Sequence, residues 1–220
     1  MGSREKFDEE LREIYRMLME MGDIAVSSIS SAMEAVEKLD EEKAKVALQN
    51  NQKSFELMRG IEDKCTELLM LQAPVAGDLR RIITAMKVSI DLNRIVRYAK
   101  NISTLALDMV KEREGHFKKL VGLKGMKKTT IEMIEKAMKA LFEKDKSLAL
   151  EVYEEEKDVD ALYEQIFREL ITYMVEDNRK ITRGVRYLLA GRYLERIADH
   201  ACNIAEGAIY VATGERISPE

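Results

Sequence analysis

Two pairs of acidic residues are the side chains in this sequence whose spacing could support chemistry. Glu195 and Asp199 stand four positions apart in a stretch with apolar residues at helical spacing, so their carboxylates leave one helix face as neighbours. Glu156 and Asp160 repeat this spacing. Two like charges so placed repel each other by a few tenths of a kcal/mol. A cation should therefore compensate each pair, either an arginine of the same helix or a metal ion.

The stretch around Glu195 and Asp199 has a counterpart in the first half of the chain. Residues 91–102 align with residues 193–204 at a constant offset of 102, with shared Leu, Arg, Ile, Ala and Asn residues, which indicates an internal repeat. In the first copy the two acids are replaced by Asn93 and Arg97. The positions that correspond to the other acidic pair hold Gln52 and Glu56.

Four carboxylates on two neighbouring helices would suit a hard or borderline cation whose coordination is completed by water. The repeat makes these two helices neighbours, so Glu156, Asp160, Glu195 and Asp199 form the predicted metal site. A solvated acidic face is the alternative, because exposed acids are common on charged helices. His200 points about 100° away from Asp199 around the helix axis and is expected at an interface or surface. Cys202 is expected to be a packing residue.

Composition favours long helices and argues against several other classes of protein. Of the 220 residues, 46% are hydrophobic and 35% charged, with two prolines and no tryptophan. A net charge of −4 gives no reason to expect nucleic-acid binding. Cys65 and Cys202 form no Cys-x-x-Cys pair, and no apolar run approaches the ~20 residues of a membrane span. We expect a cytoplasmic protein without a membrane span.

Helical periodicity and its interruptions predict an all-α fold of six long antiparallel helices, arranged as two tandem three-helix bundles. The bundles comprise residues 1–113 and 114–220, because Gly115, Gly122 and Gly125 interrupt the periodicity between residues 114 and 128. Asp40 and Asp177 are expected to cap helices, and Gly214 is expected to end the last one. The predicted helices cover residues 4–38, 41 to the residue before Pro74, 79–111, 131–142, 147–175 and 179–213.

With its internal repeat and its two acidic pairs, the chain resembles the PhoU family of phosphate-uptake regulators. The resemblance covers nearly the whole chain. Its most specific parts are residues 69–80, LMLQAPVAGDLR, and 194–204, LERIADHACNI. The family consists of tandem three-helix bundles with an E(D)-x-x-x-D pattern on two helices of each bundle. The acidic residues of the second half match this pattern, Glu56 matches it loosely, and Gln52, Asn93 and Arg97 depart from it.

The resemblance implies a role, a cofactor and partners. Family members bind iron or zinc clusters, and some are associated with magnesium or manganese, so we expect iron first, with the other metals or none as alternatives. They restrain a phosphate ABC transporter, which implies its ATPase as a partner, and in many bacteria a membrane sensor histidine kinase. The resemblance also implies a cytoplasmic homodimer that is peripheral to the membrane through its partners.

Two other classes of protein are alternatives to a regulator. A ferritin-like metal oxidase or storage protein would carry Glu-x-x-His motifs, but Ile197 precedes His200 and Arg113 precedes His116 at that spacing. With no Gly-rich phosphate loop or nucleophile arrangement either, we predict that the chain is not an enzyme. A purely structural helical interaction module without metal is the second alternative. Basic residues that could dock an acidic partner are Arg80, Arg81, Arg183 and Arg186.

Overall fold

The residues that the structure describes form six α-helices, which confirms the predicted fold class. The structure, a computed structural model, describes residues 3–71, 74–112 and 115–216. Within these residues the chain forms no strand. In order, the elements are α1 (Ser3–Lys38), α2 (Glu41–Leu71), α3 (Ala76–Lys111), α4 (Val121–Glu143), α5 (Lys146–Glu176), the 3-10 turn η1 (Asn178–Lys180) and α6 (Ile181–Thr213).

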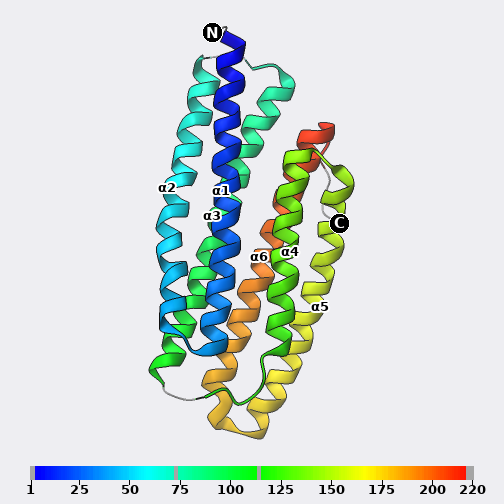
Figure 1. Ribbon diagram of the computed structural model, residues 1–220. Helices are drawn as coiled ribbons and strands as arrows, with labels where there is room; N and C mark the ends of the chain where they lie inside the picture. Colours follow the sequence, from blue (N-terminus) through cyan, green and yellow to red (C-terminus); the bar gives the residue numbers. More distant parts are fainter. Residues whose placement is uncertain (1–2, 72–73, 113–114, 217–220) are drawn as a thin grey trace.

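The six helices form two three-helix bundles that lie side by side (Figure 1). We call α1–α3 the first repeat and α4–α6 the second. The two repeats run in opposite senses, so the end where α2 meets α3 and the end where α5 meets α6 lie at opposite ends of the molecule. The repeats touch through α3 against α6 and through α1 against α4. The predicted boundary between residues 113 and 114 lies outside the described residues.

Local sequence signals set the starts and ends of several helices at the predicted positions. The Asp40 carboxylate accepts hydrogen bonds from the backbone N–H groups of Glu42 and Lys43, at 2.9 and 3.1 Å, which confirms it as a helix cap. Asp177 accepts one from the N–H of Arg179 at 3.1 Å and so caps η1. Gly214 has a φ of 79°, a conformation that favours glycine, and follows the last residue of α6.

The start of α4 differs from the prediction. The sequence predicts an irregular segment up to residue 128, but α4 begins at Val121 and therefore contains Gly122 and Gly125. A Cβ atom at Gly122 would lie only 2.6 Å from Cγ1 of Ile166 on α5. The glycine therefore permits close packing of α4 on α5 instead of breaking the helix. Helix α3 also begins three residues earlier than predicted, at Ala76.

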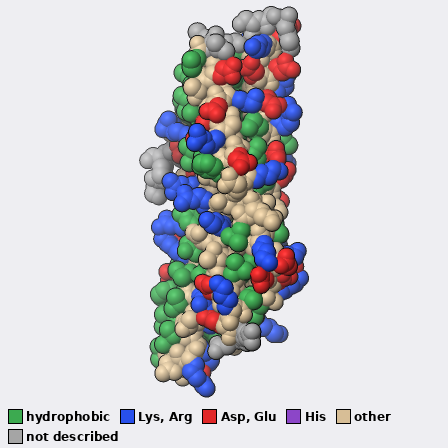
Figure 2. Space-filling view, turned by 90° about the vertical axis from the view of Figure 1, so that its left-hand side faces the viewer, with side chains coloured by type: hydrophobic (Ala, Val, Ile, Leu, Met, Phe, Trp, Pro, Cys, Tyr) green, Lys and Arg blue, Asp and Glu red, His purple; other side chains and the backbone are tan. Residues whose placement is uncertain are grey.

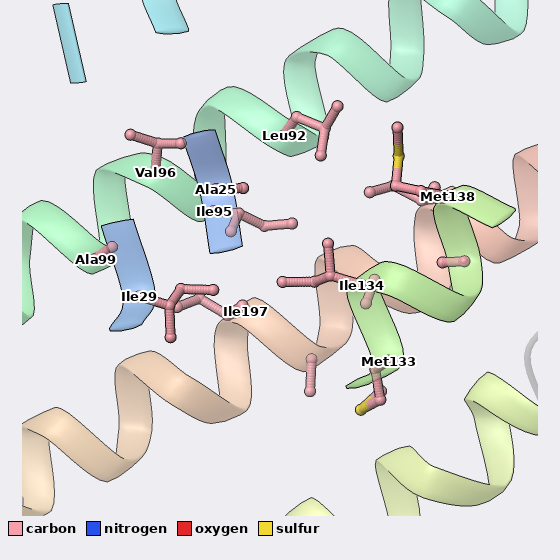
Figure 3. Packing of buried hydrophobic residues seen from close by; sticks show 14 of the residues in the cluster. Ala25, Ile29, Leu92, Ile95, Val96, Ala99, Met133, Ile134, Met138 and Ile197 are labelled. Carbon is pink, nitrogen blue, oxygen red and sulfur yellow. The ribbon is translucent and has the colours of Figure 1, made fainter. Parts of the chain in front are cut away.

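One hydrophobic core runs through both repeats. At its centre, Ile29 of α1, Ile95 of α3, Ile134 of α4 and Ile197 of α6 are all buried and gather in one region (Figure 3). Because residues from four helices and both repeats share this core, the two bundles are expected to unfold as one cooperative unit. Among the described helices, none has an apolar stretch that would cross a bilayer.

The segment between the repeats is fixed by a partly buried polar contact. The Tyr187 hydroxyl on α6 lies 2.6 Å from Nδ1 of His116, whose Nε2 lies 3.1 Å from the backbone carbonyl of Glu37. Tyr187 is fully buried, and burial raises its pKa to about 12. His116 therefore joins the end of α1 to the start of α6, where both of its ring nitrogens have partners.

Candidate metal centre on α5 and α6

The four predicted carboxylates share one outer face of the second repeat, where α5 and α6 pack closely. Tyr153 on α5 donates a hydrogen bond to the backbone carbonyl of Cys202 on α6, at 3.3 Å. A Cβ at Gly191 would lie 3.1 Å from Cδ2 of Tyr163, so the glycine also permits close approach of the two helices. These contacts place the acids of α5 beside those of α6. We call Glu156, Asp160, Glu195 and Asp199 the acidic face.

The electrostatics of Glu156 show that the four acids act on one another. Burial raises the pKa of the Glu156 carboxyl above its usual value, and the negative charges of Asp160, Asp199 and Glu195 raise it further. Neither Glu156 nor Asp160 makes an ion pair with a described residue. The α5 half of the acidic face is therefore a place where added positive charge would be stabilising.

On α6 an arginine compensates each acid. Arg192 pairs with Glu195, and Arg196 pairs with Asp199 at 2.9 Å, each from three residues earlier on the helix. One of the two compensating cations that the sequence suggested, an arginine of the same helix, is thus in place. The second oxygen of Glu195, Oε2, is buried without a hydrogen-bond partner. Such an unsatisfied buried oxygen calls for an explanation, and an absent ligand is one.

The donor set fits a cation by chemistry, but the side chains are not arranged as a ready-made ligand cluster. In the part of the chain that the structure describes, no group of three His, Cys, Asp or Glu side chains lies close enough together to hold a metal ion. The arginines engage the two acids of α6, so a metal would have to draw Glu195 and Asp199 away from Arg192 and Arg196. Carboxylate oxygens are suitable ligands for iron, manganese, magnesium and zinc.

The matching face of the first repeat has different chemistry. Gln52 donates a hydrogen bond to Glu56 at 2.8 Å, and Ser54 donates one to the buried side chain of Asn93 at 3.2 Å. Arg97 is exposed and forms no ion pair with a described residue. Figure 2, which looks onto the α2 side of the molecule, shows positive and negative side chains interspersed. These four positions offer amides, one carboxylate and a cation instead of four carboxylates.

His200 lies at the interface between the repeats and not on the acidic face. Its Nδ1 is 2.7 Å from an oxygen of Asp91 on α3, and Asn203 donates a hydrogen bond to the same oxygen at 3.2 Å. The ring also lies 5.8 Å from that of Tyr98. Asp91 is not among the site residues that the sequence predicts. Its signal in the sequence is a difference between the repeats: the first repeat has the acidic Asp91 at the position where the second has Tyr193.

The two thiols are packing groups in the folded protein. Burial raises the pKa values of Cys65 and Cys202 to about 12, and nearby acids add to the shift of Cys202. Both cysteines are free. Because the thiolate is the form that binds metals, neither is prepared as a ligand at neutral pH.

The four basic residues named for docking have different surroundings. Arg183 is only 3% exposed, donates to a backbone carbonyl of α3 at 3.3 Å, and pairs with Glu112 at 3.3 Å. Arg186 pairs with the same carboxylate. These two residues hold α6 against α3, and burial leaves Arg183 little surface for a partner. Arg80 and Arg81 are half-buried, and their docking role stays a prediction.

Together, the fold and this face define an all-α protein of two repeated three-helix bundles, with four carboxylates on the second repeat. Comparison with known proteins agrees with this class. The model of the PhoU domain matches the chain twice, over residues 18–106 and 123–208. The chain belongs to the PhoU family.

Relatives match over nearly their full length. A protein of Clostridium acetobutylicum is 34% identical over 98% of both chains, and one of Xylella fastidiosa is 32% identical over 97% of this chain and 88% of its own. Both are named as phosphate-specific transport system accessory protein PhoU homologues. The family is one of accessory proteins and not of enzymes, as the sequence predicted, and the ferritin-like oxidase alternative gains no support.

Solved structures share the fold. The crystal structure of PhoU from Pseudomonas aeruginosa superposes with a TM-score of 0.91 at 34% identity, covering 95% of this chain and 100% of that one. The structure of the phosphate transport system regulatory protein PhoU from Streptococcus pneumoniae gives a TM-score of 0.87 at 27% identity, with 97% and 100% covered.

Proposed function

We propose that this chain is an accessory protein of a phosphate-specific transport system and that it regulates phosphate uptake. The observation that carries the proposal is the match of both repeats, over nearly the full chain, to relatives that bear this name. A helical bundle alone would not indicate phosphate, so the role depends on this kinship.

Within that role, we propose that the acidic face binds a metal ion, with iron first and zinc, magnesium or manganese as alternatives. The raised pKa of Glu156 and the unsatisfied oxygen of Glu195 support a cation at this place. A bound cation would give Glu156 and Asp160 a positively charged partner, which no described residue provides. Glu156 and Asp160 would hold it from α5, and Glu195 and Asp199 would hold it from α6 after release from their arginines.

The protein partners would be an ATPase subunit of the phosphate ABC transporter and a sensor histidine kinase. The chain would bind them in the cytoplasm, at the periphery of the membrane. We also propose that it forms a homodimer. An exposed row of apolar side chains near the α5–α6 turn supports docking of a protein partner, because large exposed apolar patches mark interaction sites. Val175 is 82% exposed. The row comprises Phe167, Ile171 and Val175 of α5 and Ile181, Val185 and Leu189 of α6.

The role can be tested in a bacterial host that lacks its own PhoU protein. We expect this chain to lower the uptake of radiolabelled phosphate when phosphate is plentiful. A matched variant, Phe167→Glu/Val185→Glu, changes only exposed side chains and should fold but fail to lower uptake. The proposal is contradicted if the folded chain, at the level of the host's own protein, leaves uptake unchanged and does not bind the host's transporter ATPase in purified form.

A further inference from the structure

A groove between the two repeats lies on the side formed by α1 and α4. Its volume is about 370 Å³. Gly22 of α1 and Ile134 and Met138 of α4 form its buried floor, and the exposed residues Asp23 and Glu135 stand at its mouth. This volume is at the low end of ligand pockets, roughly 300–1,000 Å³. It is enough for one or two large side chains, not for a whole helix.

Gly22 keeps this groove open without relieving a clash. Glycine is unfavourable inside a helix, and α1 is 36 residues long. A Cβ at Gly22 would lie 3.4 Å from Cε of Met138, which is ordinary contact, so the packing would accept alanine. At Gly207, by contrast, a Cβ would lie 2.9 Å from Cγ2 of Thr84. A close approach therefore explains Gly207, whereas Gly22 leaves room above a methionine floor.

The chemistry of the groove specifies what would fill it. Met19, 55% exposed, and Met138 are adaptable apolar groups that suit varied apolar side chains. Asp23 and Glu135 make no ion pair or hydrogen bond with any described residue. Lys139 follows Glu135 by one turn but does not pair with it within 4 Å. An apolar site with two unpaired carboxylates at its mouth complements an apolar side chain flanked by basic residues.

We propose that the α1/α4 groove docks an amphipathic basic helix of a partner protein. The helix inserts one large apolar side chain over Gly22 and places Lys or Arg side chains against Asp23 and Glu135. The helix lies across the groove and enters it only with this anchor, unlike the helix-in-groove mode, in which a whole apolar helix face is seated. The bound helix touches both repeats. Its site is separate from the acidic face and from the apolar row on α5 and α6, so it does not depend on the proposed metal.

The test uses the full chain and a labelled synthetic peptide of about 18 residues, or five helical turns, with leucine on one face and lysine on the other. Fluorescence anisotropy measures its binding beside a peptide with glutamate in place of lysine. Gly22→Leu fills the groove, and Asp23→Asn/Glu135→Gln neutralises its mouth. The control Asp63→Asn/Glu67→Gln removes two exposed, unpaired charges from α2.

We expect the lysine peptide to bind more tightly than the glutamate peptide, and either groove variant to weaken binding by about tenfold or more, with less than about twofold change in the control. Equal weakening in the control would mean general attraction to an acidic protein and would overturn the proposal. So would unchanged binding in both groove variants, or photo-crosslinks from the peptide centre to α5 and α6. Asp23→Asn/Glu135→Gln keeps the test valid if Gly22→Leu fails to fold.

Discussion

The packing of α3 against α6 can be tested with one substitution made at two glycines. Gly207→Ala places a Cβ 2.9 Å from Cγ2 of Thr84 on α3, closer than side chains normally approach. Thr84 is buried and β-branched, so it cannot easily turn aside. Gly22→Ala places the same methyl group inside α1, where its nearest neighbour is 3.4 Å away and belongs to a flexible methionine.

The two substitutions should change the free energy of unfolding by different amounts. Replacing a glycine inside a helix by alanine gains about 0.8–1.0 kcal/mol at either position. At Gly207, overpacking against Thr84 costs about 1–3 kcal/mol, so the net effect is near zero to about 2 kcal/mol of destabilisation. At Gly22 the gain of about 1 kcal/mol remains. The two variants should therefore differ by about 1–3 kcal/mol in free energy of unfolding.

Urea denaturation and thermal unfolding of the two variants and the wild type measure this difference. For a chain of this size, 1 kcal/mol shifts Tm by roughly 2–4 °C, so the two Tm values should lie roughly 2–12 °C apart, with Gly22→Ala above the wild type. If Gly207→Ala is stabilised as much as Gly22→Ala, then α3 and α6 do not pack as closely as described, and the reasoning is refuted.

Three further predictions concern buried or partly buried polar groups. Tyr187→Phe leaves Nδ1 of His116 without its buried partner and should lower the free energy of unfolding by about 1–3 kcal/mol in urea titrations; no loss would mean that water replaces the hydroxyl. Because burial raises their pKa values to about 12, Cys65 and Cys202 should react with Ellman's reagent at pH 8 far more slowly in the folded protein than in urea; equal rates would contradict their burial. Glu156 has a raised pKa, so its ionised form destabilises the metal-free folded state once the pH exceeds the unfolded value of about 4.3. Glu156→Gln should therefore stabilise the metal-free protein at pH 7 but not at pH 3.5, and an equal effect at both pH values would argue against an electrostatic cause.

The six-helix fold was predictable because its signals are local. Asp40 caps a helix through N–H groups two and three residues away, and Gly214 ends one by its own backbone conformation. The start of α4 was mispredicted because the sequence does not show Ile166 beside Gly122. A glycine required by close packing and a glycine that breaks a helix look alike until the neighbouring helix is in place.

The acidic face was predictable in position but not in arrangement. Helical spacing and the internal repeat bring Glu156 and Glu195 to adjacent helices, where burial, and then the charges of Asp160, Asp199 and Glu195, raise the pKa of Glu156. The rotamers that pair Glu195 with Arg192 depend on packing that the sequence does not reveal. Contacts between the repeats are equally hidden, because the 2.7 Å contact of Asp91 with His200 depends on the register of α3 against α6.

The central claim, a metal site on the second repeat alone, is most directly tested by quantifying bound metal after the purified protein is loaded separately with iron, zinc, manganese and magnesium. The variant Glu195→Gln/Asp199→Asn removes two carboxylates, and Asn93→Ala/Arg97→Ala changes the matched positions of the first repeat. We predict that the wild type and the first-repeat variant bind at least one of these metals in equal amounts and that the second-repeat variant binds none of it. Absence of binding by the wild type, or loss of metal from the first-repeat variant instead, would contradict the account.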